Sequence, residues 1–280
     1  MPKLTITILV ENTVGVTAGV IGEWGLAMLL DFGDERLLID TGEQGNIVRN
    51  AGTLEIDLHQ IDRVILSHGH YDHTGGLIEF LKVRGKVPVY AHPEIFSGHY
   101  GPVFNGAGNR FIGVPFRLEQ LVSAGAEFHW VREPVKLRPG LWLSGEVPRR
   151  TEFELGDKKL VQDQAGTMVH DPLKDDFSVF YATNTGLIIL LGCAHAGVVN
   201  IIEYAKEVTA ERRVRAVIGG THLGPVEAEQ KDKTIEYLKS LDLELLAPNH
   251  CTGLPMAGRL AQEFPAQFRW ASVGMVIEFE

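Results

Sequence analysis

Short hydrophobic runs, separated by glycine and polar residues, divide much of the chain into predicted strands. These runs are Leu4–Val10, Leu26–Phe32, Arg36–Ile39, Val64–Leu66, Val87–Ala91, Ser178–Ala182, Leu187–Leu191, Val214–Ile218, Leu243–Leu246 and Val273–Phe279. Hydrophobic residues with helical spacing predict helices at Gly76–Lys82, Val198–Val208, Glu229–Leu238 and Gly258–Phe264. The first three strands lie close together, as hairpins would, whereas the later ones alternate with helices. This mixture predicts an α/β fold with two β-sheets and helices outside them, a four-layer αββα sandwich.

The segment from about residue 92 to 150 departs from this pattern. It is rich in glycine, proline and aromatic residues and contains the glycine-rich stretch from Gly101 to Arg110. Long irregular segments in compact domains are usually lids or binding loops. We therefore expect an insertion over the active site of a single domain that spans residues 1–280. A linker between two domains is disfavoured, because candidate metal ligands fall on both sides of the segment.

The composition, 45% hydrophobic and 22% charged, is that of a globular protein with a substantial core. No hydrophobic run is long enough for a membrane helix, and the first ten residues alternate like a strand instead of resembling a signal peptide. Two cysteines, Cys193 and Cys251, are too few for a disulfide scaffold, so a cytoplasmic location is expected. A formal net charge of −10 disfavours nucleic acid and membranes and leaves a small-molecule substrate as the expected partner. The oligomeric state stays open, a homo-oligomer included.

Three histidines and an aspartate crowd into residues 68 to 73, HGHYDH. They follow a predicted strand and precede a predicted helix, so they occupy a tight turn between rigid elements. Imidazole nitrogens and a carboxylate suit Zn²⁺, and also Mn²⁺ or iron. The pattern predicts that His68, His70, Asp72 and His73 bind metal.

Three further histidines, His195, His222 and His250, share one local setting. Each follows a hydrophobic predicted strand and a turn of small residues, at the edge of an α/β layer where ligands usually bind. We predict that they belong to the same site. Cys193 and Cys251 flank these histidines and are expected to be small buried residues rather than ligands. Of the remaining histidines, His59, His99 and His129 are expected to be solvated, whereas His92 and His170 are candidates for lining the pocket.

The HxHxDH pattern after a hydrophobic strand resembles the metallo-β-lactamase superfamily. Within it, the chain is similar to the dihydropteroate-synthase-like branch, which is named for an archaeal pterin-ribofuranosylaminobenzene phosphate synthase. The block Ser67–Gly76 (SHGHYDHTGG) is typical of the superfamily. Three blocks are specific to the branch: Gly192–Asn200 (GCAHAGVVN), Gly219–Leu223 (GGTHL) and His250–Gly253 (HCTG). The block Leu38–Gly42 (LIDTG) resembles a motif whose aspartate supports the site.

The resemblance implies two divalent metal ions, zinc foremost, with manganese or iron as alternatives. One ion would be held by His68, His70 and His195, and the second by Asp72, His73 and His250.

The chain departs from the family pattern at two places. Many hydrolases of the superfamily carry a bridging aspartate where this chain has Thr221 and His222. A weak second site therefore stays an alternative, and His222 either binds metal or only hydrogen-bonds. Trp24 follows Glu23 where relatives tend to carry a histidine, which changes the expected pocket wall.

A site that activates water at a metal ion predicts a hydrolase for a small molecule, with a phosphoester as the expected substrate and Asp72 as the catalytic residue. Backbone N–H groups of the turns Gly75–Gly76 and Thr252–Gly253 are expected to stabilise developing negative charge. The alternative reaction is the transfer performed by the branch's named member, a condensation with a pterin pyrophosphate. A sensor, a diiron oxidoreductase and a nuclease are disfavoured. Candidate substrate-binding residues are Trp24, Arg110, His170 and Asp176.

Overall fold

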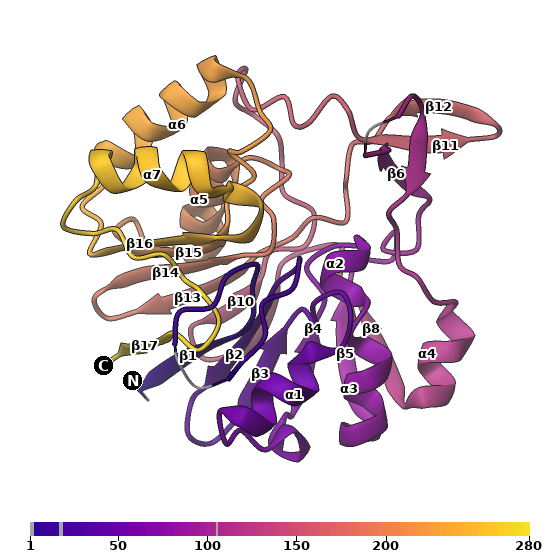
Figure 1. Ribbon diagram of the computed structural model, residues 1–280. Coiled ribbons are helices and arrows are strands. Elements are labelled where there is room, and N and C mark those ends of the chain that lie inside the picture. The colour runs from indigo at the N-terminus through magenta and orange to yellow at the C-terminus, as the bar shows by residue number, and fades with distance from the viewer. Residues whose placement is uncertain (1–2, 17–18, 105) are drawn as a thin grey trace. The chain divides into compact units, whose positions relative to one another are not determined.

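The computed structural model describes residues 3–16, 19–104 and 106–280, so Asn105 of the glycine-rich stretch lies outside the described residues. These residues form two compact units (Figure 1). The amino-terminal unit comprises the described residues of Pro2–Trp130, Asp157–Asp175 and Ser272–Glu280. The carboxy-terminal unit comprises Val131–Gly156 and Asp176–Ala271. That the whole chain acts as one domain stays a prediction.

The amino-terminal unit is built on a seven-stranded sheet in the order β17-β1-β2-β3-β4-β5-β8. The strands from β17 to β3 are antiparallel, and those from β3 to β8 are parallel. Figure 1 shows α1 and α3 against one face of this sheet, where Ile47, Phe80 and Leu81 pack on Leu38 and Val64. The bounds are β1 Leu4–Val10, β2 Ala27–Asp31, β3 Arg36–Ile39, β4 Arg63–Ile65, β5 Val87–Ala91, β8 Ala126–Trp130, β17 Val276–Phe279, α1 Asn46–Thr53, α2 Tyr71–Thr74, α3 Leu77–Arg84 and α4 Leu118–Ala124.

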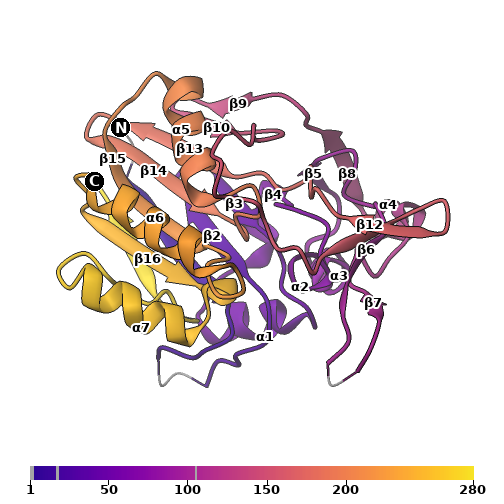
Figure 2. The same cartoon turned by 90° about the horizontal axis from the view of Figure 1, so that it is seen from above.

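A four-stranded sheet in the order β12-β11-β6-β7 completes this unit (Figure 2). Its strands are β6 His99–Pro102, β7 Asn109–Phe111, β11 Val161–Gln164 and β12 Thr167–His170. A small buried cluster of Ile112, Leu160 and Leu173 packs against Tyr71, which lies within the HGHYDH motif. The small sheet is thereby joined by packing to the turn that carries the first group of candidate ligands.

The carboxy-terminal unit contains a six-stranded sheet in the order β16-β15-β14-β13-β10-β9. Its last three strands, β14 to β16, are parallel and hydrophobic, which is typical of strands buried on both faces. Figure 1 shows α5, α6 and α7 together on one side of these strands. The bounds are β9 Val135–Arg138, β10 Leu141–Leu143, β13 Val179–Thr183, β14 Gly186–Leu191, β15 Val214–Gly220, β16 Leu245–Asn249, α5 Val198–Thr209, α6 Ala228–Lys239 and α7 Leu254–Glu263.

The range 92–150, predicted to be one insertion, is more regular than its composition suggests. It contributes β6 and β7 to the small sheet, β8 to the seven-stranded sheet, and β9 and β10 to the six-stranded sheet. Much of the range is therefore integral to the main sheets, and its position over an active site stays a prediction. None of the helices in the described ranges combines the length and hydrophobicity that crossing a membrane requires.

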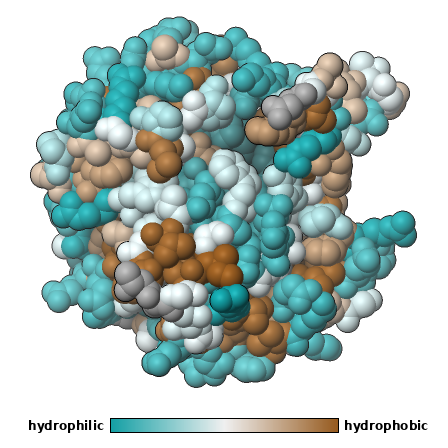
Figure 3. Space-filling view, viewed as in Figure 1, coloured by the Kyte–Doolittle hydropathy of each residue, from teal (hydrophilic) through white to brown (hydrophobic). Residues whose placement is uncertain are grey.

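The surface face seen in Figure 3 is mostly hydrophilic, with a group of adjoining hydrophobic residues near its lower centre. Several large hydrophobic side chains are nevertheless exposed, and Trp24 is 51% exposed. Single exposed hydrophobic residues are normal in globular proteins. We therefore assign no function to surface hydrophobicity.

Candidate metal centre

The HGHYDH motif follows β4, as predicted, with His68, Gly69 and His70 in the turn and Tyr71, Asp72 and His73 in α2. His70 is the residue before α2, and its carbonyl oxygen accepts bonds from the N–H groups of His73 and Thr74 and from the Thr74 hydroxyl. These bonds close one helical turn and hold Asp72 and His73 on it. Each of His68, His70, Asp72 and His73 is at most 6% exposed. Four potential ligands are therefore buried on a short, internally bonded segment.

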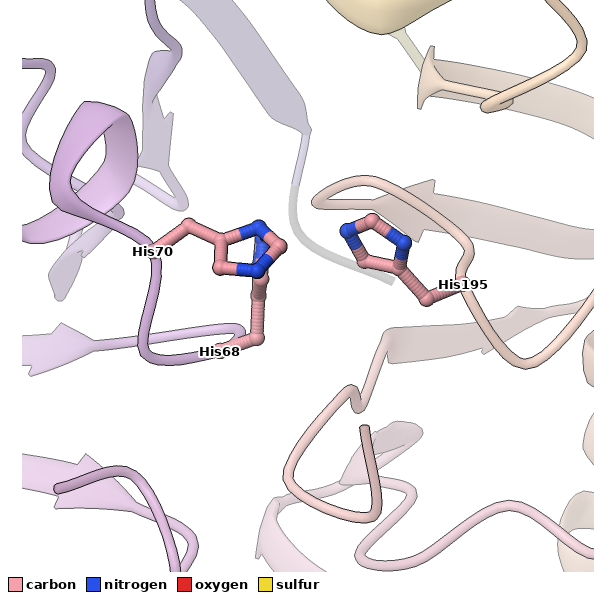
Figure 4. Close-up of side chains that lie close together, drawn as sticks. All are labelled: His68, His70 and His195. Carbon is pink, nitrogen blue, oxygen red and sulfur yellow. The ribbon is translucent and has the colours of Figure 1, made fainter. Parts of the chain in front are cut away.

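Two of these imidazoles lie side by side, as Figure 4 shows for His68 and His70. The His68 Nε2 and His70 Nδ1 atoms are 3.0 Å apart, and the His68 and His73 ring centroids are 4.2 Å apart. Burial lowers the pKa of His70 to about 3, and the neighbouring Asp72 carboxylate only partly opposes this. His70 is therefore neutral at physiological pH, which is the form of imidazole that binds metal.

The Asp40 carboxylate fixes the orientation of Ser67 and of the His73 ring. Its carboxylate accepts bonds from the Ser67 N–H at 2.8 Å and the Ser67 hydroxyl at 2.7 Å, and lies 2.7 Å from His73 Nδ1. A proton on His73 Nδ1 shared with Asp40 leaves the lone pair of the ring on Nε2. Ser67 Oγ is in turn 3.0 Å from His68 Nδ1. The geometry agrees with the supporting role that the resemblance implies for Asp40.

A second buried network, not predicted from the sequence, reaches the same turn. His99, expected to be solvated, is 2% exposed, with its Nδ1 2.6 Å from Asp171 and its Nε2 3.5 Å from Asp175. Asp175 also accepts a 2.7 Å bond from the N–H of Gly69, between His68 and His70. Burial lowers the pKa of His99, but the bonds to Asp171 and Asp175 outweigh it and raise that pKa to about 10. A charged His99 thus links the small sheet to the ligand turn.

We expect Asp175→Ala to lower the free energy of unfolding by about 1–3 kcal/mol, because the buried Gly69 N–H loses its acceptor. Urea denaturation of the metal-depleted protein measures this loss. Asp163→Ala is the matched control, since Asp163 accepts a bond from the Gly166 N–H on an exposed hairpin and should cost less than about 0.5 kcal/mol. Equal losses in the two variants would show that the bond to Gly69 contributes nothing.

The three strand-end histidines lie where the hydrophobic strands end, as predicted. His195 follows β14, His222 follows β15 and His250 follows β16 directly. His222 and His250 both have φ of +49°, and Ala194 has φ of +55°. Residues other than glycine adopt this left-handed conformation at a cost, and such strain is concentrated at functional sites. The His195 and His222 ring centroids are 4.2 Å apart (His195 is labelled in Figure 4).

Both cysteines are buried beside these histidines, as expected. Potential ligand atoms lie within 4.8 Å of one another in two groups of this unit: Cys193 with His195 and His222, and Cys193 with His250 and Cys251. Burial raises the pKa of the Cys251 thiol, but Cys193 and His222 beside it lower that pKa by more. The carboxy-terminal unit therefore offers sulfur as well as nitrogen ligands.

Three of the expected backbone donors for negative charge, the N–H groups of Gly75, Gly76 and Gly253, are engaged within the chain, which corrects the expectation for them. The N–H of Gly75 bonds to the Tyr71 carbonyl, that of Gly76 to the Gly42 carbonyl, and that of Gly253 to the His250 carbonyl. The bonds of Gly75 and Gly253 close local turns, and the bond of Gly76 joins its turn to the segment after β3.

The candidate substrate-binding residues fall in different settings. Asp176 is 1% exposed and accepts a 2.9 Å bond from the Ala196 N–H, so its carboxylate supports the turn that carries His195. His170 is exposed on β12. The Arg110 guanidinium is exposed, lies 5.2 Å from the Tyr71 ring centroid and donates a 2.9 Å bond to the Tyr71 hydroxyl. Substrate binding by any of these residues, Trp24 included, stays a prediction.

The family is decided by a comparison with known protein families. The family model described as the metallo-beta-lactamase superfamily matches residues 25–206. The chain belongs to the metallo-β-lactamase superfamily. This match contains the HGHYDH turn, the LIDTG segment and the loop of His195, so the family predicted from the sequence is confirmed.

Individual relatives extend the similarity over nearly the whole chain. The 7,8-dihydropterin-6-methyl-4-(beta-D-ribofuranosyl)-aminobenzene-5'-phosphate synthase of Methanocaldococcus jannaschii is 31% identical, over 99% of this chain and 97% of that protein. An uncharacterised protein of the same organism is 32% identical over 97% of this chain and 99% of its own length. The crystal structure of Tm1679, described as a metal-dependent hydrolase of the β-lactamase superfamily, has a TM-score of 0.85 at 25% identity and covers 99% of both chains. The predicted α/β metallo-β-lactamase fold is therefore confirmed.

Proposed function

We propose that this metallo-β-lactamase superfamily member is a metal-dependent hydrolase of a small phosphoester. The observation that carries the proposal is the HGHYDH turn, where His68, His70, Asp72 and His73 are buried together. Burying four polar groups is costly unless they are bonded or bind a ligand. The neutral His70 and the Asp40-bound His73 are in the state that metal binding requires. The donor set therefore fits a divalent metal ion.

The proposed ligands divide between the two units. The amino-terminal unit supplies His68, His70, Asp72 and His73, and the carboxy-terminal unit supplies His195, His222 and His250. We propose two divalent ions, with zinc foremost and manganese or iron as alternatives. Bound divalent ions supply acidity to water and polarise a phosphoryl oxygen.

The residues of the chain have distinct roles in this proposal. A carboxylate oxygen of Asp72 orients the attacking water and accepts its proton, then returns it to the leaving oxygen. Asp40 holds the His73 ring through Nδ1, and Ser67 carries that support to His68. Asp175 and Asp176 hold the turns of the two ligand groups through backbone N–H bonds.

A phosphoester is the proposed substrate because of the charge near the turn. Arg110 stacks over Tyr71, directly beside Asp72 in sequence, and its guanidinium is exposed. Arginine presents a planar set of N–H donors that matches phosphate oxygens. The net charge of −10 speaks against a nucleic-acid substrate, so a small molecule is proposed.

A transferase is the second candidate, and one observation favours it. The named relative with 31% identity over nearly the whole chain is a synthase for a pterin-containing product. In such a transfer, metal ions held by the same ligands would stabilise a departing pyrophosphate instead of activating water.

One experiment separates the two reactions. Protein purified without added metal is analysed for metal content and assayed with bis(4-nitrophenyl) phosphate, before and after addition of Zn²⁺ or Mn²⁺. About two metal ions per chain and metal-dependent turnover would support the hydrolase. Failure to turn over, with pyrophosphate released only when a pterin pyrophosphate and an aminobenzene ribosyl phosphate are both present, would favour the transferase. His129→Ala, which changes an exposed histidine, is the control for both assays.

A further inference from the structure

The loop between β14 and α5 places a cysteine among the histidines of the carboxy-terminal unit. Cys193 is 3% exposed and lies two residues before His195. Its Sγ atom is within 4.8 Å of a ring nitrogen of His195 and of His222. The left-handed Ala194 between Cys193 and His195 turns the chain at this point. Residues two apart in sequence thus both supply an atom to one compact group.

Cys251 has a different setting. Its Sγ accepts a 3.2 Å bond from the His222 N–H and lies 3.6 Å from the Cys193 carbonyl oxygen, to which its thiol donates. Its sulfur is also packed against the end of β15, where a side chain on Gly220 would come within 2.7 Å of it. The Cys251 thiol therefore hydrogen-bonds to the backbone of two turns, the one that carries His222 and the one that carries Cys193.

We propose that Cys193 Sγ is a metal ligand together with His195 and His222. This inference rests on the proposed metal centre and names a ligand that the family pattern does not supply. The turn after β15 carries Thr221 and His222 and no carboxylate, so the two imidazoles of His195 and His222 bring no negative charge of their own to a cation. A thiolate provides the missing negative charge at the end of the neighbouring strand. On binding, the S–H proton passes to solvent and a metal–sulfur bond forms.

The consequence is a preference among metals. Thiolate is a soft ligand that favours Zn²⁺ and Co²⁺ over Mn²⁺ and Mg²⁺, which prefer oxygen. Thiolate and imidazole are both ligand types that zinc takes in proteins, so Cys193, His195 and His222 would together suit that ion. Cys193 would thus decide which ion the carboxy-terminal ligands retain.

Cobalt substitution tests the proposal on the full-length protein. Metal-depleted wild type, Cys193→Ser and Cys251→Ser are titrated with Co²⁺, and the thiolate-to-cobalt charge-transfer absorption in the near ultraviolet is recorded. We expect this absorption in wild type and in Cys251→Ser. We expect its loss in Cys193→Ser, with Co²⁺ bound at least about tenfold more weakly. Loss in Cys251→Ser with retention in Cys193→Ser would overturn the proposal, as would cobalt-loaded wild type without the absorption.

X-ray absorption at the zinc edge provides a measurement that needs no Cys193 variant. The zinc-loaded wild type and Cys251→Ser should both show a sulfur shell at about 2.3 Å. A shell of nitrogen and oxygen alone in wild type, or loss of sulfur in Cys251→Ser, contradicts the assignment. Sulfur-bound metal without phosphodiester turnover would reject only the proposed hydrolase, whereas wild type that binds no metal would reject both proposals.

Discussion

Replacing Asp72 with alanine is expected to lower kcat for phosphodiester hydrolysis by about 10²- to 10⁴-fold, the usual contribution of a general acid–base group. Asp72 lies in the first turn of α2 and is 6% exposed. Its backbone carbonyl accepts the Leu26 N–H, a bond that alanine retains. The loss should therefore affect chemistry more than folding. Steady-state kinetics with parallel metal analysis measures it.

Metal content distinguishes the two roles proposed for Asp72. A variant that retains its metal but loses turnover assigns proton transfer to the carboxylate, whereas a variant that loses metal assigns ligation. Asp72→Asn should lose turnover similarly, because an amide cannot accept the proton. Asp232→Ala, which removes a carboxylate from an exposed ion pair with Arg259, serves as the control. Turnover by Asp72→Ala within a factor of ten of wild type would exclude Asp72 from the chemistry.

The parts of the site that were predictable from the sequence depend on local patterns. The HGHYDH turn and the strand-end histidines directly follow hydrophobic runs, and such runs identify buried strands without knowledge of their partners. The strands that precede the ligands, β4 and β14 to β16, begin and end within three residues of the predicted bounds. The position of a ligand is then fixed by the residue at which its strand ends.

The parts that were missed depend on contacts between distant residues. The bond from the Gly69 N–H to Asp175 joins residues 106 apart, and His99 reaches Asp171 over 72 residues. Nothing near His99 in the sequence indicates burial, because its neighbours are glycine, serine and tyrosine. Only the pairing of β6 with β11 brings the partners together. A histidine followed about 70 residues later by two closely spaced aspartates is, by itself, weak evidence that the three residues form a buried network.

Composition was equally misleading for part of the fold. The eight residues of α1, Asn46–Thr53, include two asparagines, an arginine and a glycine, so few hydrophobic residues mark this helix, yet Ile47 and Ala51 pack in the core. The strands β8 to β10 are short and partly exposed, and they were absorbed into the predicted insertion. Short strands acquire their structure from their neighbours in a sheet, which a local pattern does not contain.

The second large effect is expected at Asp40, where alanine should lower the free energy of unfolding by about 3–5 kcal/mol, because three buried donors lose their acceptor and each loss costs about 1 kcal/mol or more. The carboxylate is fully buried and bonded to the Ser67 N–H, the Ser67 hydroxyl and His73 Nδ1. Its removal leaves these donors without an acceptor. Asp40 also has φ of +58°, a conformation that alanine adopts at a further cost of about 1 kcal/mol. Urea denaturation of the metal-depleted protein measures the loss.

Two further variants separate the charge of Asp40 from its backbone. Asparagine tolerates the left-handed conformation and keeps one acceptor oxygen, so Asp40→Asn should cost less than Asp40→Ala yet weaken metal binding about 10- to 100-fold, because His73 loses the carboxylate that orients it. Asp31→Ala is the control, since Asp31 forms a partly exposed ion pair with Arg36 on the neighbouring strand and should cost about 1 kcal/mol or less. If Asp40→Ala were no more destabilising than Asp31→Ala, the buried network around Ser67 and His73 would not be what holds the ligand turn in place.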